Sequence, residues 1–243
     1  MNKKRRIWIN KGISLIENLI SIALFLFIVM GVLEVFSLSR DHFKKIKSSQ
    51  EANTAACVAL DKIRGDLQQC GKGFTDLSCP EIVTSLKAEG NTLILRRVEG
   101  CFYLNNPLFA GQTRIPLLDT SDFKKGMELI FASATYGEIQ TISSVDSTGI
   151  VLFSSLINSY SIDESEFHLL NKISFYLDKS KKILRRKVNS SPAQPLCEEV
   201  ESFLCSFAPE TNLVKIFLTL TLDPEKIYEI SVFPKNTALS TSR

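Results

Sequence analysis

Apolar residues dominate one long run near the N-terminus, from position 13 to position 38. Its purest stretch covers positions 19–33, with Glu17 just before it and Glu34 just after it. As a helix rising about 1.5 Å per residue, the run is about 39 Å long, which exceeds the roughly 30 Å hydrocarbon core of a bilayer. The pattern therefore predicts a membrane-spanning helix whose two glutamates lie near opposite margins.

The helical pattern continues past position 38 but becomes amphipathic. One face carries apolar side chains at the spacing i, i+4, i+7 and i+11, and the opposite side carries polar ones. The apolar set is Ala56, Leu60, Ile63 and Leu67, and the polar set is Asp61, Lys62, Asp66 and Gln69. Gly71 and Gly73 then give a glycine-rich helix end. We predict one helix from about position 13 to position 70.

After Gly73 the apolar residues alternate with a period of two, which is typical of strands. Strands are predicted at 93–95, 127–133, 138–145, 150–154, 173–177, 214–222 and 227–233. Asp223 and Pro224 are predicted to stop the strand that begins at Val214. Short strands with regular turns indicate an antiparallel sheet, and the apolar stripe of the helix would pack against it. The predicted fold class is therefore α+β.

Composition and charge narrow the class of protein. Hydrophobic residues make up 44% of the 243 residues and charged residues 23%, which excludes a disordered or collagen-like chain. The net charge of +3 leaves no global electrostatic footprint for nucleic acid. The mean hydropathy of +0.08 is high for a soluble protein, and most of the excess lies in the N-terminal run.

The N-terminal motif resembles a type IV prepilin signal. A basic leader ends in Gly12, a hydrophobic residue follows, and Glu17 is the fifth residue counted from Ile13. The usual first residue in that family is Phe, and Ile keeps its hydrophobic character. The resemblance implies cleavage after Gly12 by a prepilin peptidase on the cytoplasmic side, followed by N-methylation of Ile13.

Glu17 needs a partner, because an ionisable group in an apolar span is expensive. That partner would be the new amino group of Ile13, either on the same chain or on a neighbouring subunit. In the family that the motif resembles, this glutamate has the role of an assembly contact. A cleaved secretory signal fits poorly, because the Gly precedes the apolar run and no A-x-A site follows it. An uncleaved signal anchor is the alternative. Basic residues flank the run on both sides, so the motif and the cysteines, rather than the charge bias, favour a cytoplasmic N-terminus.

The rest of the chain is similar to the larger minor pseudopilins, namely component J of type II secretion and the PilW-like minor pilins. The matching segments read EANTAACVALDKIRGDLQQCG, ISFYLDKSKKILRRK and QPLCEEVESF, whereas positions 73–167 match only in general character. The implied plan is a leader at 1–12, a transmembrane or filament-core helix at 13–38, an amphipathic helix at 39–71 and a globular β-rich, pilin-like domain at 72–243.

This resemblance implies a minor pseudopilin of a type II secretion or type IV pilus-like filament, located at the tip and priming assembly, and not an enzyme. Its partners would be other pseudopilins or minor pilins, the prepilin peptidase and the inner-membrane assembly platform. The chain would cross the inner membrane once, with its C-terminal domain in the periplasm. Secretion, pilus and DNA-uptake roles stay open. The alternative from another class is a membrane-anchored periplasmic enzyme or sensor with an uncleaved anchor.

The six cysteines form no C-x-x-C pair, which argues against zinc or dithiol chemistry. Their even number in an exported domain favours disulfides. Cys57 and Cys70 would be about 20 Å apart along a helix, too far for a bridge. Bridges are expected within the set Cys70, Cys79 and Cys101, with another that links Cys197 or Cys205 to a site elsewhere, and Cys57 is expected to be a free core thiol.

Little other chemistry is visible in the sequence. His42 and His168 are expected to be structural or solvated, and no metal or cofactor is predicted. The strongest basic cluster lies on a predicted hairpin, where solvated charge is the favoured interpretation. Contact with DNA, anionic lipid or an acidic partner is the alternative. The residues that would make this contact are Lys181, Lys182, Arg185 and Arg186.

Overall fold

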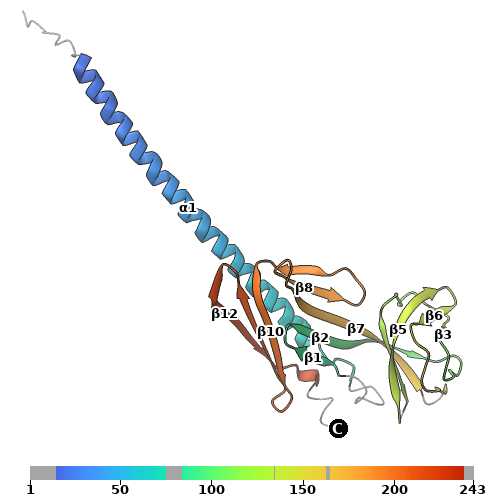
Figure 1. Ribbon diagram of the computed structural model, residues 1–243. Helices are drawn as coiled ribbons and strands as arrows, with labels where there is room; N and C mark the ends of the chain where they lie inside the picture. Colours follow the sequence, from blue (N-terminus) through green and yellow to red (C-terminus); the bar gives the residue numbers. More distant parts are fainter. Residues whose placement is uncertain (1–14, 75–83, 134, 163–164, 238–243) are drawn as a thin grey trace, which may run out of the picture. The chain divides into compact units, whose positions relative to one another are not determined.

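The computed structural model describes residues 15–74, 84–133, 135–162 and 165–237. The chain divides into two compact units, Met1–Gln50 and Glu51–Arg243. Helix α1 covers Leu15–Gln68 as one continuous element of 54 residues, and twelve strands and a short helical turn at 235–237 follow it (Figure 1). The predicted α+β class is confirmed, and the predicted helix end at position 70 is two residues too late.

The C-terminal part of α1 buries the face that the sequence predicts. Ala56, Leu60, Ile63 and Leu67 are each at most 5% exposed. Asp66, which the pattern places on the side opposite this apolar face, is nevertheless also buried. The turn after the helix needs glycine at Gly73, where φ is +80° and a Cβ would lie 2.7 Å from the Cβ of Val98.

Twelve strands follow α1, and all their pairings are antiparallel within the described chain. They are β1 (Leu86–Glu89), β2 (Thr92–Tyr103), β3 (Arg114–Pro116), β4 (Glu128–Ser133), β5 (Gly137–Asp146), β6 (Gly149–Leu152), β7 (Ser165–Asp178), β8 (Ile183–Val188), β9 (Gln194–Cys197), β10 (Val200–Ala208), β11 (Leu213–Leu220) and β12 (Asp223–Val232). The antiparallel sheet expected from the alternating pattern is therefore confirmed.

The strands form two sheets. One has nine strands in the order β1-β2-β7-β4-β5-β6-β3, with β8 on β7 and β9 on β8, and the other has the order β10-β11-β12. The predicted end of the β11 strand is wrong. Leu220 pairs with Asp223, so a two-residue turn joins β11 to β12, and Asp223 begins the next strand instead of stopping the last one.

Two main cores and one small one lie inside the unit Glu51–Arg243. The first joins the buried stripe of α1 to β1, β2, β7, β8 and the three-stranded sheet. The second lies among β3, β4, β5, β6 and β7 and contains stacked aromatic rings, such as Phe102 of β2 on Phe167 of β7 at 5.3 Å. The third consists of Phe74, Ile130, Ala132 and Leu170. Strand β7 contributes to all three, with Phe167 in the second core and Phe175 in the first.

Candidate functional site

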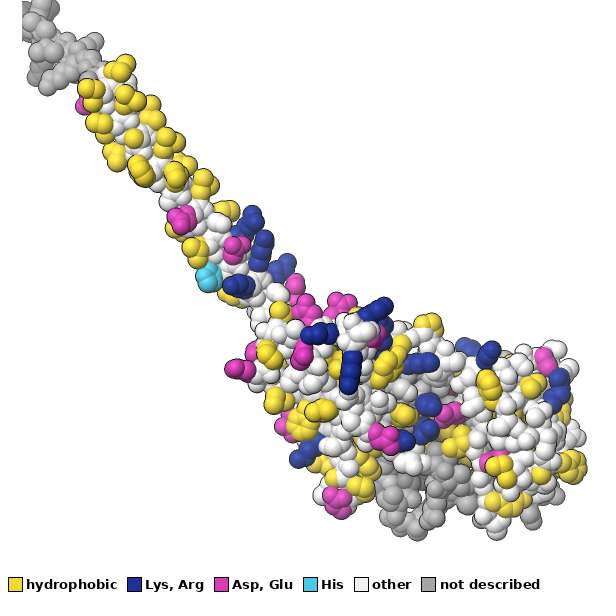
Figure 2. All heavy atoms as spheres, viewed as in Figure 1, with side chains coloured by type: hydrophobic (Ala, Val, Ile, Leu, Met, Phe, Trp, Pro, Cys, Tyr) yellow, Lys and Arg dark blue, Asp and Glu magenta, His cyan; other side chains and the backbone are white. Residues whose placement is uncertain are grey.

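The N-terminal part of α1 is an apolar surface. Among residues 15–50 no side chain is buried, and large apolar groups such as Leu15 (78% exposed) and Phe27 (74% exposed) face outward. Figure 2 shows hydrophobic side chains covering the visible face of this part of the helix. By length and composition this helix could cross a membrane, with a mean hydropathy of 2.7 over its most apolar window. Such a surface needs lipid or other helices to cover it.

Glu17 lies in the first turn of α1, where a carboxylate is favoured by the helix dipole. Its side chain is exposed among apolar neighbours that include Ile16 and Leu19. Gly12 and Ile13 lie outside the described residues. The predicted cleavage site, and the amino group expected to face Glu17, therefore stay predictions.

An ion pair joins the end of α1 to the β7–β8 hairpin. Nε of Arg186 lies 2.7 Å from Oδ2 of Asp66, with the two side chains 14% and 8% exposed. Nζ of Lys62, one helical turn before Asp66, lies 3.7 Å from the other carboxylate oxygen of Asp66. Solvated charge is the favoured expectation for Arg186 and an anion contact the alternative, but the structure pairs its guanidinium with a carboxylate of its own chain.

Two further residues of the basic cluster are also paired. Arg185 lies 3.0 Å from Asp178, and Lys182 lies 2.7 Å from Glu201. The Lys182 side chain holds the pKa of the Glu201 carboxyl below its usual value. A groove of about 550 Å³ at this hairpin is lined by Lys181 and Lys182 but also by carboxylates, including Glu199. Three residues of the cluster are therefore paired with carboxylates of their own chain, and only Lys182 of these is half exposed to solvent, whereas Arg185 and Arg186 are largely buried.

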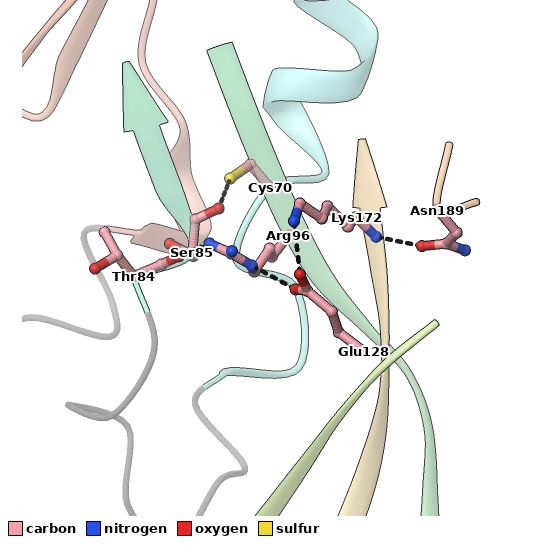
Figure 3. A network of polar contacts seen from close by, with 7 residues as sticks. All are labelled: Cys70, Thr84, Ser85, Arg96, Glu128, Lys172 and Asn189. Carbon is pink, nitrogen blue, oxygen red and sulfur yellow. Dashed lines mark hydrogen bonds and ion pairs between the residues drawn. The ribbon is translucent and has the colours of Figure 1, made fainter. Parts of the chain in front are cut away.

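A second polar network fixes the segment after α1 to the large sheet (Figure 3). Glu128 on β4 accepts hydrogen bonds from Nε of Arg96 at 2.9 Å and from Nζ of Lys172 at 2.6 Å. Arg96 also donates to the carbonyl of Thr84 at 3.1 Å. Burial works against the charged form of Glu128, but the hydrogen bonds from Lys172 and Arg96 outweigh it and lower the pKa of the carboxyl. The network therefore links β2, β4 and β7 and ties Thr84, just before β1, to them.

Free thiols replace the predicted disulfides among the described cysteines, and Cys79 lies outside the described residues. Cys70 donates to the carbonyl of Ser85 at 3.0 Å, and Cys205 to that of Thr92 at 3.2 Å. Burial raises the pKa of Cys70 to about 12 and those of Cys197 and Cys205 to about 11. Cys57 is free as expected but exposed, so its predicted place in the core is wrong.

Comparison with known proteins does not assign the chain to a family. No family model matches the chain, and no curated protein does. A solved structure that matches in part is the Gp54 tailspike of Acinetobacter baumannii bacteriophage AP22, in complex with a capsular saccharide of that bacterium. The match has 17% identity and a TM-score of 0.25, and it covers 33% of this chain and 15% of the tailspike. A likeness this low carries no argument about fold or function.

One cluster escaped the sequence analysis altogether. Cys101, Glu166 and His168 offer a thiol, a carboxylate and an imidazole whose ligand atoms all lie within 4.8 Å of one another. More than sixty positions separate Cys101 from Glu166. Only the pairing of β2 with β7 brings them together, and the local spacing of cysteines could not reveal it.

Proposed function

We propose that this chain is a minor pseudopilin: a single-pass membrane subunit that is processed by a prepilin peptidase and enters a pilus-like filament. The proposal rests on one coincidence. A basic leader that ends in Gly12 comes just before a helix that carries Glu17 in its first described turn. The N-terminal part of this helix is apolar and exposed, and its C-terminal part packs into an antiparallel β domain.

Assembly, rather than catalysis, is the mechanism under this proposal. The apolar surface of α1 would move from contact with lipid to contact with the helices of sister subunits. Because both surroundings are apolar, the free energy of its burial would change little. Glu17 would be paired with a terminal amine, which removes the cost of a lone carboxylate at that depth. The subunits that it meets would be other pseudopilins or minor pilins.

The decisive experiment is the intact mass of the membrane-extracted chain, with and without a co-expressed prepilin peptidase. We expect loss of the first 12 residues, leaving 231 of the 243, with one added methyl group. The variant Gly12→Val should stay full length. The variant Gly31→Ala is the matched control, because a Cβ at Gly31 meets no atom within 4 Å, and it should be processed normally.

An unprocessed wild-type chain, in cells that process a known prepilin, would refute the proposal. It would favour instead the membrane-anchored enzyme or sensor with an uncleaved signal anchor.

A second experiment separates processing from assembly. The variants Glu17→Leu and Glu34→Leu each remove one carboxylate from α1, and both side chains are exposed. In cells that carry the sister subunits, we expect both variants to be cleaved but only Glu34→Leu to co-purify with those subunits at the wild-type level. Equal co-purification of the two variants would contradict the role assigned to Glu17.

A further inference from the structure

The β2–β7 pairing places three metal-binding side chains on one face of the large sheet. Cys101 on β2 lies directly across from His168 on β7. Glu166 precedes His168 by two positions on the same strand, so its side chain points to the same face. On the other side of β7, Ile130 of β4 lies across from His168. The three polar residues therefore form a compact group beside an apolar strand.

His168 is buried without a hydrogen bond. Its side chain is 3% exposed, and neither ring nitrogen has a hydrogen-bond partner within the part of the chain that the structure describes. Nε2 lies 3.0 Å from Oε1 of Glu166, but the two groups are not aligned for a hydrogen bond. An unsatisfied polar group in the interior is costly, so this imidazole calls for a ligand of another kind.

The remaining distances agree with a shared ion. Sγ of Cys101 lies 3.7 Å from Oε2 of Glu166, and the three donor atoms all lie within 4.8 Å of one another. Zinc binds sulfur at about 2.3 Å and nitrogen or oxygen at about 2.0–2.2 Å, which puts neighbouring tetrahedral ligands about 3.3–3.8 Å apart. Small side-chain rotations would bring all three donors to that spacing.

We infer that Cys101, Glu166 and His168 bind a divalent ion of the zinc class. A thiolate, a carboxylate and a neutral imidazole together balance the two positive charges of such an ion. The sulfur and nitrogen donors are softer ligands than oxygen, so they favour zinc over magnesium or calcium. Three protein ligands leave a fourth position for water or for a ligand from a partner.

The surroundings suit this site. A small apolar core of Ile130 and Ala132 on β4, Leu170 on β7 and Phe74 after α1 adjoins the histidine and shields it from water. Cys101 is exposed, so an ion can reach the site from solvent. The register of β2 against β7 shifts between Val98 and Gly100, just before the cysteine, and bulges of this kind often re-aim side chains at functional sites.

This site does not depend on the proposed function, because it lies in the β domain and involves neither the leader nor the apolar part of α1. A bound ion would clamp β2 to β7, the strand that contributes to all three cores. Binding to the folded state alone would raise thermal stability.

The test uses the full-length protein in detergent, stripped with a chelator and reduced, then titrated with Co²⁺ as a spectroscopic substitute for Zn²⁺. We expect one ion per chain and a thiolate-to-cobalt charge-transfer band that Zn²⁺ abolishes. Cys101→Ser should remove the band. Cys57→Ser is the matched control, because Cys57 is also exposed and free, and it should leave the band intact.

A second variant keeps the test independent of the thiol signal. Glu166→Gln should weaken binding by at least about 10-fold, since the loss of a ligand costs no less than the loss of a supporting contact. Near-UV circular dichroism of each stripped variant would verify its fold.

Several results would overturn the inference. These are the absence of stoichiometric binding to the wild-type protein, a band that survives Cys101→Ser, wild-type affinity in Glu166→Gln, and a peptide map of the unreduced protein that places Cys101 in a disulfide.

Discussion

Replacing Arg186 with Met removes the cation that faces Asp66 while keeping much of the aliphatic volume of the side chain. The carboxylate of Asp66 is only 8% exposed, and its nearest cationic atom is Nε of Arg186 at 2.7 Å. After the substitution the remaining cation within 4 Å would be Lys62, at 3.7 Å, whose side chain is half exposed to solvent. The variant therefore leaves a charge in the interior with weak compensation.

The expected cost follows from the burial of this pair. Removing one partner of a buried ion pair costs about 3–5 kcal/mol. Lys62 offsets part of that, so we expect a loss near the lower end, about 3 kcal/mol. For a unit of the size of Glu51–Arg243, each kcal/mol lowers the melting temperature by about 2–4 °C, which gives a fall of about 6–12 °C.

The assay is thermal unfolding of the full-length protein in detergent, followed by the near-UV signal of its tyrosines and phenylalanines. Lys182→Met is the matched control, because it breaks a pair with Glu201 in which both side chains are about half exposed. Such a surface pair is worth less than about 1 kcal/mol. If Arg186→Met melted at the same temperature as Lys182→Met, the reasoning would be refuted. Adding Asp66→Asn to Arg186→Met should recover part of the loss, because no charge then stays buried unpaired.

Two other predictions concern ionisable groups of the β domain. The pKa of Glu128 is lowered in the folded state, so its contribution to stability is complete above the ordinary value of 4.5 and is lost as the pH falls through the lowered value. In wild-type protein the midpoint of urea unfolding should therefore fall as the pH drops below 4.5, and Glu128→Gln should reduce this fall. An equally large fall in the variant would contradict the stabilising role of the Glu128 network. In the native protein at mildly alkaline pH, iodoacetamide should modify the exposed Cys57 and spare Cys70, whose burial raises its pKa to about 12. Equal labelling of the two, measured by peptide mass, would count against this placement of the thiols.

Local pattern in the sequence determined the elements of the fold. An apolar run followed by a 3.6-residue stripe gave helix α1 and its buried face at Leu60 and Ile63, because a helix repeats its contacts every turn. Alternation with a period of two gave most of the strands, because successive side chains in a strand point to opposite faces. Both signals lie within a few residues of chain and need no tertiary information.

The tertiary structure alone decided which polar residues meet. Asp66 looked solvent-facing because its place on the helix is polar, and Arg186 looked like a surface cation, yet the folding of the β7–β8 hairpin against α1 pairs the two in the interior. Cys101 and His168 share no local motif, and only the register of β2 on β7 places them opposite each other. Contacts between residues far apart in the chain depend on strand order and register, which the periodicity of a single segment does not encode.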